Sequence, residues 1–205
     1  MKIIINVLLF CTVLFITACP SPLPDRYVSV QKTYTSTGGG NLIDAPTHDY
    51  TFTIDIQDDG SIISFDNVKL LGLYHPYVSF LSATIMNPQG KSLYIFDNTN
   101  FLPTSLELHH DYTFTDSSTD FYQQEAAPSV VIAAIPYKVP QIFKLDGTPN
   151  TESGNPGLNS FANENIKGSW KLILHNTQEA IGTYGSPRIS NWSIDLTYNK
   201  KISGG

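Results

Sequence analysis

Acidic residues in two polar stretches near the middle of this 205-residue chain are the clearest candidates for metal binding. Asp97 begins the run Asp-Asn-Thr-Asn, while Asp116 and Asp120 enclose the run Ser-Ser-Thr. Ca²⁺ is held by carboxylate and carbonyl oxygens, so Asp97, Asp116 and Asp120 are candidate ligands for a calcium ion. Their spacing does not follow an EF-hand loop, and solvated turns are the alternative interpretation.

The five histidines are weaker candidates for a metal site than these aspartates. His109-His110-Asp111 has the residue types of a metal site, but neighbouring side chains in an extended chain point to opposite faces. No third ligand is spaced to complete the set, so we expect a solvated loop there.

Nucleophilic catalysis and nucleic-acid binding are both unsupported. The chain has no Gly-x-Ser-x-Gly segment that would present a serine nucleophile. Its formal net charge is −6, and its largest basic cluster is the pair Lys200-Lys201. Proteins that bind nucleic acid need a basic surface, so we do not expect a nucleic-acid partner.

Two segments near the C-terminus predict the strands that build the core. Hydrophobic residues alternate with polar ones from Trp170 to Leu174 and again from Trp192 to Leu196. A period of two places each set on one face of a strand. We therefore predict that Trp170 and Trp192 are buried on facing strands near a closing hairpin. Gly168 fits a preceding turn that needs a positive φ.

Further segments alternate in the same way, with polar, Gly- and Pro-containing turns between them. This spacing predicts an all-β fold, an antiparallel β-sandwich of jelly-roll-like kind. The additional expected strands cover residues 27–34, 50–56, 68–73, 81–87, 91–96 and 130–135.

The N-terminus is typical of an export signal. Lys2 precedes an apolar run that ends in Ile16-Thr17-Ala18-Cys19, and a Pro-rich spacer follows. Small residues before a cysteine resemble the bacterial lipobox, in which the cysteine is lipidated and becomes the first residue. Cys19 would then be the only cysteine left and would anchor the protein to a membrane of the bacterial cell envelope. An ordinary secretory signal is the alternative.

These features divide the chain into four parts. Residues 1–18 form the lipoprotein-type signal, and residues 19–41 form a tether with an N-terminal strand. Residues 42–199 form the sandwich, and residues 200–205 form a C-terminal tail.

Several motifs resemble the P-domain (P/Homo B domain) of subtilisin-like proprotein convertases over roughly residues 50–198. Glu164 to Leu174 reads acidic-Asn-x-x-Gly-x-Trp-x-Leu-x-Leu, and a second Trp strand follows after a loop. His75 to Gly90 is similar to the family's His-x-Tyr-x-x-Asp-Leu-x-x-x-Leu-x-x-Pro-x-Gly, with Phe80 in place of the aspartate. The structural motif residues that match are His75, Pro88, Gly90, Phe161, Gly168, Trp170 and Trp192.

The resemblance implies a β-sandwich that lacks catalytic residues of its own. Nothing in the chain resembles the His-Gly-Thr-His or Gly-Thr-Ser-x-Ala segments of the protease domain. At His75 it implies a structural role, in which the ring donates to loop carbonyls. Since some P-domains bind Ca²⁺, it also keeps the calcium interpretation open.

We therefore predict a tethered, non-catalytic module that binds or stabilises a protein partner, with a protease as one candidate partner. Two alternatives belong to other classes. One is a protease-associated protein with serine-type endopeptidase activity inherited from the family. The other is an adhesin that binds Ca²⁺ or glycans.

Overall fold

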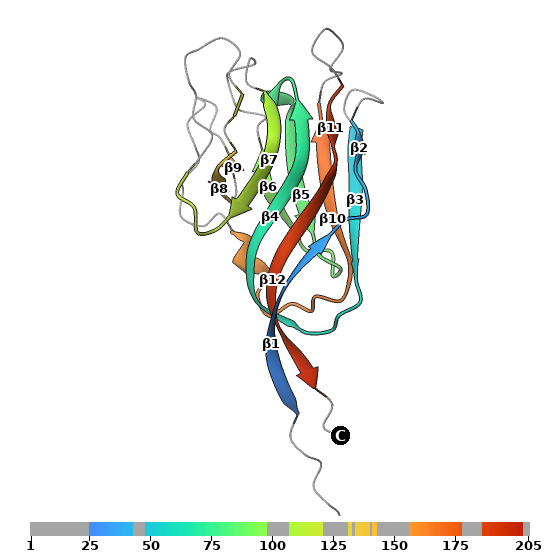
Figure 1. Cartoon of the computed structure of the whole chain (residues 1–205), viewed down its shortest axis with the longest axis vertical. Helices are drawn as coiled ribbons and strands as arrows, with labels where there is room; N and C mark the ends of the chain where they lie inside the picture. The colour runs from blue at the N-terminus through green and yellow to red at the C-terminus, as the bar shows by residue number, and fades with distance from the viewer. Residues whose placement is uncertain are drawn as a thin grey trace, which may run out of the picture.

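The computed structural model describes residues 25–42, 48–97, 107–120, 131–132, 134–139, 141–142, 156–177 and 186–202. These residues form two β-sheets packed face to face (Figure 1). The predicted all-β antiparallel sandwich is confirmed, although two short strand pairs, β6–β9 and β7–β8, run parallel. No helix in the described part of the chain is long and apolar enough to cross a bilayer.

The first sheet has the order β1-β12-β4-β11-β2, with β7 pairing β4 and β8 pairing β7. Its longest strands are β4 and β12, and their pairing forms the middle of the sheet. The strands are β1 (Arg26–Thr35), β2 (Gly40–Asn41), β4 (Ser61–His75), β7 (Leu108–Thr115), β8 (Pro136–Lys138), β11 (Arg188–Ile189) and β12 (Asn191–Ile202).

The second sheet has the order β3-β10-β5-β6-β9. Single 3₁₀ turns come before two of its strands in the chain. Its strands are β3 (His48–Ile56), β5 (Leu81–Met86), β6 (Ser92–Asp97), β9 (Gln141–Ile142) and β10 (Gly168–Asn176), and the turns are η1 (Val78–Phe80) and η2 (Leu158–Phe161).

Both tryptophans lie in the core, as the alternating pattern predicted. Trp170 on β10 and Trp192 on β12 are fully buried, each in a different sheet. The ring of Trp170 packs edge-on against Phe65 and Phe161, with centroids 5.6 and 5.4 Å away. β10 and β12 therefore belong to different sheets and do not form the hairpin that we expected.

The positive φ angle expected at Gly168 is confirmed, and other residues share this conformation. Gly168, the first residue of β10, has a φ of +121°, and Gly90 in the β5–β6 turn has a φ of +86°. Asn163 has a φ of +69°, and Asn reaches this region more readily than most residues because its side chain can hydrogen-bond locally.

Two local expectations need correction. Within the expected strand 130–135, of which residues 130 and 133 lie outside the described part, Val131 makes only an isolated bridge to Glu107. The nearby described strand is β8, at Pro136–Lys138. His109 and His110 are exposed as expected, but they lie on strand β7 and not in a loop.

One strand pair extends beyond the rest of the sandwich. β1 pairs with β12 along its whole length, from Arg26 opposite Ile202 to Thr35 opposite Ser193. The outer part of this pair projects from one end of the molecule (Figure 1). We call the two paired strands the β1–β12 ribbon.

Candidate functional site

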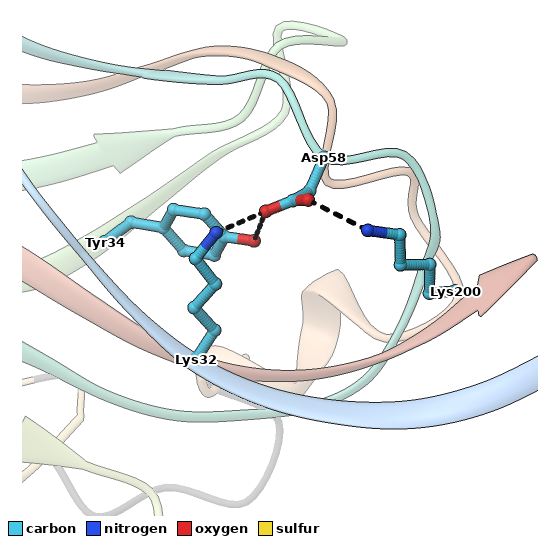
Figure 2. A network of polar contacts seen from close by, with 4 residues as sticks. All are labelled: Lys32, Tyr34, Asp58 and Lys200. Atoms are coloured by element: carbon cyan, nitrogen blue, oxygen red, sulfur yellow. Dashed lines mark hydrogen bonds and ion pairs between the residues drawn. The ribbon is translucent and has the colours of Figure 1, made fainter.

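A polar network lies where the ribbon leaves the sandwich (Figure 2). Asp58, in the turn between β3 and β4, accepts hydrogen bonds from Lys32 Nζ at 2.6 Å and from the Tyr34 hydroxyl at 2.8 Å. Its second carboxylate oxygen lies 3.5 Å from Lys200 Nζ. Lys32 and Tyr34 belong to β1 and Lys200 to β12, so one carboxylate joins both strands of the ribbon to the β3–β4 turn.

The network holds Asp58 in its charged form. The hydrogen bond from Lys32, followed by that from Tyr34, lowers the pKa of Asp58 from 3.8 to about 2. The same hydrogen bond raises the pKa of Lys32. Burial, with hydrogen bonds to Tyr198 and Asp58, raises the pKa of the Tyr34 hydroxyl. Near neutral pH Asp58 is therefore negative, Lys32 is positive and the Tyr34 hydroxyl is neutral. None of the three changes its protonation there, which suits a positioning role better than proton transfer.

A cleft of about 530 Å³ lies next to this network. Its walls come from the outer part of the ribbon, the β3–β4 turn and the segment that leads into β10. The lining residues are Tyr27, Gln57, Asp58, Asp59, Gly60, Ser61, Asn165, Asn199, Lys200 and Lys201.

Apolar side chains are exposed on the ribbon. Tyr27 is 58% exposed, Val28 40% and Ile202 44%. β1 is also the terminal strand of its sheet, so within the described residues no strand pairs with its outer edge. An edge strand of this kind can pair with an extended segment of another chain.

A second polar network, at the opposite end of β4, is buried and structural. His75 is fully buried, and its Nδ1 accepts a hydrogen bond from the Tyr77 backbone N–H at 3.1 Å. Its Nε2 therefore carries the proton and donates to Asn176 Oδ1 at 3.3 Å. Asn176 Nδ2 in turn donates to the Leu42 carbonyl at 3.1 Å. Burial lowers the pKa of His75 from 6.5 to about 4, so the ring stays neutral.

This network corrects one detail of the sequence interpretation. His75 donates to a side-chain amide on β10, whereas we had expected it to donate to loop carbonyls. It thus links β4 in one sheet to β10 in the other.

The described residues contain no group of three His, Cys, Asp or Glu side chains placed to hold a metal ion. Asp97, Asp116 and Asp120 all lie within those residues and do not form such a group. Asp116 instead caps η2, where its two oxygens accept hydrogen bonds from the backbone N–H groups of Leu158 and Asn159 at 2.8 and 2.9 Å.

The remaining motif residues pack together or shape turns. Pro88 and Gly90 form the β5–β6 turn, in which Asn87 Oδ1 accepts hydrogen bonds from two backbone N–H groups. Phe161 is buried beside Trp170. Cys19 and the lipobox-like segment lie outside the described residues.

The sequence analysis did not predict the Asp58 network. One signal was present in β1. Lys32 and Tyr34 lie two residues apart and follow Val28 and Val30, so they share a strand face with apolar residues. A charged residue on a face that is otherwise apolar needs a partner.

Comparison with known proteins finds only a weak structural similarity to solved structures. No protein-family model matches the sequence. No curated protein matches it significantly either. Among solved structures, the chain is similar to the serine protease of Aeromonas sobria, with a TM-score of 0.39 and 15% identity. It is also similar to a structure of that protease in complex with the chaperone, with a TM-score of 0.41 and 15% identity.

Each alignment covers 88% of this chain and 28% of the matched chain. The chain thus spans less than a third of the length of the chains that it matches. At these scores the likeness carries no argument about function.

Proposed function

We propose that this chain is a non-catalytic, envelope-tethered β-sandwich module that binds and stabilises another protein through the β1–β12 ribbon. The P-domain resemblance suggests a protease as the class of partner. The observation that carries the proposal is the projecting ribbon, on which Val28 and Ile202 are exposed and whose outer edge pairs with no other strand among the described residues.

The chemistry of the ribbon suits strand addition. A partner segment that pairs with β1 would gain main-chain hydrogen bonds along the edge and contact alternate side chains. Val28 lies on the strand face that continues outward from the core, because it shares that face with Val30, which pairs with buried Tyr198. An apolar side chain of the partner would remove Val28 from water.

The Asp58 network supports this role by fixing the ribbon before binding. Lys32 and Lys200 are held to one carboxylate, and Thr33 donates a hydrogen bond to Asp195 across the two strands at 2.6 Å. A surface that is already ordered loses less conformational entropy when it binds.

Lipidation of Cys19 is part of the proposal. Cys19 precedes β1 by only a short segment, so a lipid there would hold the ribbon near the membrane. The partner is then expected to be another protein of the cell envelope. The test of this part is mass spectrometry of the N-terminal peptide. An unmodified Cys19 thiol, or a mature start beyond it, would contradict the anchor.

Capture from the native envelope tests the binding role. The wild-type protein, a Val28→Asp variant and a Tyr94→Asp variant serve as baits. Tyr94 is 49% exposed but lies on β6 in the other sheet, so it is the matched control. We expect a partner that wild type and Tyr94→Asp capture and that Val28→Asp loses. Capture that is equal for all three baits would contradict the ribbon as the binding surface.

The protease-associated alternative makes a different prediction. If the chain were itself an endopeptidase, the purified protein would cleave a peptide library, and the activity would copurify with it under stringent conditions. We expect no turnover above that of a mock preparation.

A further inference from the structure

The cleft beside the ribbon has the composition of a small-molecule site that the protein-binding role does not use. Its volume of about 530 Å³ lies within the range of ligand pockets, roughly 300–1,000 Å³. Tyr27 supplies an exposed aromatic ring, and Gln57, Asp59, Asn165 and Asn199 supply planar amide or carboxylate groups.

The charges that line the cleft balance each other. Asp58 and Asp59 contribute two negative charges, and Lys200 and Lys201 contribute two positive ones. Asp58 is neutralised further by Lys32, at 2.6 Å, and Lys201 lies 2.8 Å from Asp25. The ammonium groups around Asp58 oppose binding of a metal cation, while the two aspartates oppose binding of an anion. The electrostatics therefore favour a neutral polar ligand.

Polar groups on opposite walls are held in place before any ligand binds. Asn165 Nδ2 donates to Asp59 Oδ1 at 2.8 Å, while Asn165 Oδ1 accepts from the Lys167 backbone N–H at 2.8 Å. Asp58 is fixed by Lys32 and Tyr34. Such groups lose little freedom on binding, which makes directional hydrogen bonds to ligand hydroxyls more favourable.

From this geometry we propose that the cleft binds a neutral saccharide. The ring of Tyr27 packs on an apolar sugar face, and the carboxylate of Asp59 accepts hydrogen bonds from sugar hydroxyl groups. The amides of Gln57 and Asn199 add donors and acceptors on the remaining walls. This site uses side chains of the outer part of the ribbon, the β3–β4 turn and the segment that leads into β10. Partner binding instead uses the backbone edge of β1 and Val28.

A glycan array and isothermal titration test the proposal directly. The probes are neutral oligosaccharides of glucose, galactose and N-acetylglucosamine, with sialylated and sulfated glycans as charged comparisons. Full-length wild-type protein is compared with Tyr27→Ala, Asp59→Asn and Tyr94→Ala. Tyr94 is an exposed tyrosine that does not line the cleft and lies on β6 in the other sheet, so it serves as the control.

We expect at least one neutral oligosaccharide to bind, with affinity at least tenfold weaker for Tyr27→Ala and for Asp59→Asn and unchanged for Tyr94→Ala. We also expect the affinity for the oligosaccharide to stay the same between 50 and 500 mM salt. This is about a tenfold range in ionic strength, over which charge pairs are strongly screened. Absence of any neutral ligand at millimolar concentration would overturn the proposal. So would binding that is restricted to charged glycans, or binding that survives Tyr27→Ala.

The two proposals fail separately. Loss of partner capture in Val28→Asp with sugar binding intact would support both sites. Sugar binding without any captured partner would leave the cleft assignment standing and contradict the ribbon.

Discussion

Gly168 lies directly against Pro88, 80 positions earlier in the chain, at the point where β10 enters the sandwich. A Cβ atom added at Gly168 would lie 2.7 Å from Pro88 Cβ. The two residues come from separate motif segments of the sequence analysis, and their contact shows that these segments pack against each other. The glycine allows the β5–β6 turn to pack against the start of the strand that carries Trp170.

Replacement of Gly168 by Ala should therefore destabilise the fold for two reasons. The backbone has a φ of +121°, which disfavours any side chain, and the new methyl group meets Pro88. Strain of this kind costs about 1–3 kcal/mol, and the close contact adds to it. Chemical denaturation measures the change in the free energy of unfolding.

Two glycines serve as graded controls. Gly90 has a φ of +86° but nothing within 4 Å of an added Cβ, so Gly90→Ala should show the backbone strain alone. Gly38 has neither constraint, so Gly38→Ala should be nearly neutral. If Gly168→Ala were no more harmful than Gly90→Ala, the contact with Pro88 would not matter to stability.

The two buried tryptophans should respond differently to the same substitution. Trp170 Nε1 donates to the Ile166 carbonyl at 2.9 Å, whereas Trp192 Nε1 is buried with no hydrogen-bond partner among the described residues. Trp170→Phe should cost about 1 kcal/mol more than Trp192→Phe, since only the first leaves a carbonyl unpaired. Truncation of either tryptophan to Ala should cost about 3–5 kcal/mol. Equal losses for the two Phe variants would contradict the difference.

Burial of neutral His75 predicts a loss of stability in mild acid. Its pKa is about 4 in the folded protein and near 6.5 in the unfolded chain. The folded state therefore binds fewer protons between these values, and stability falls as the pH is lowered from 6.5 to 4. The size is on the order of 3 kcal/mol, from about 1.36 kcal/mol for each unit of pKa difference.

Denaturation of His75→Gln as a function of pH tests this assignment. The variant should start less stable at neutral pH and should lose less stability between pH 6.5 and 4 than wild type. His109→Gln, at an exposed position on β7, should retain the wild-type slope. Parallel curves for wild type and His75→Gln would show that His75 does not cause the pH dependence.

Removal of the Asp58 carboxylate should loosen the ribbon. Asp58→Ala deprives Tyr34 of its acceptor and Lys32 and Lys200 of their counter-charge, which should cost about 1–2 kcal/mol. Hydrogen exchange should increase in β1 far more than in β10. Asp55→Ala, at an exposed position on β3, is the control and should leave both strands unchanged.

The titration of Asp58 has a defined sign. Its pKa is lowered from 3.8 to about 2 in the folded protein, so its stabilising effect is complete above pH 3.8 and is lost as the pH falls toward 2. NMR of the carboxyl carbon should report this low pKa in wild type. In a Lys32→Met variant the pKa should move back toward 3.8, because the hydrogen bond from Lys32 is the largest cause of the shift.

The strands could be predicted from the sequence because the alternation that specifies them is local. The alternation of Trp170, Leu172 and Leu174 predicts β10 within five residues, and all three side chains are buried. The hairpin expected between the two Trp strands was wrong because local alternation does not say which strands pair. β10 pairs with β3 and β5, and β12 pairs with β1 and β4.

The sites depend on contacts between distant parts of the chain. Asp58 meets Lys200 across 142 positions, and His75 meets Asn176 across 101. No local pattern specifies such pairs. Asp116 is a further example, because its hydrogen bonds to the backbone of η2, more than 40 positions later, could not be read from the polar run in which it lies.

Site-specific photo-cross-linking tests the central claim, that the ribbon is the surface through which the module binds a protein. A photoreactive residue is introduced at Val28 on the ribbon or, as the control, at Tyr94 on β6, and both proteins are irradiated in intact cells. We predict a discrete cross-linked protein from position 28 and none from position 94. A discrete product from position 94 alone, or no product from either position, would contradict the account.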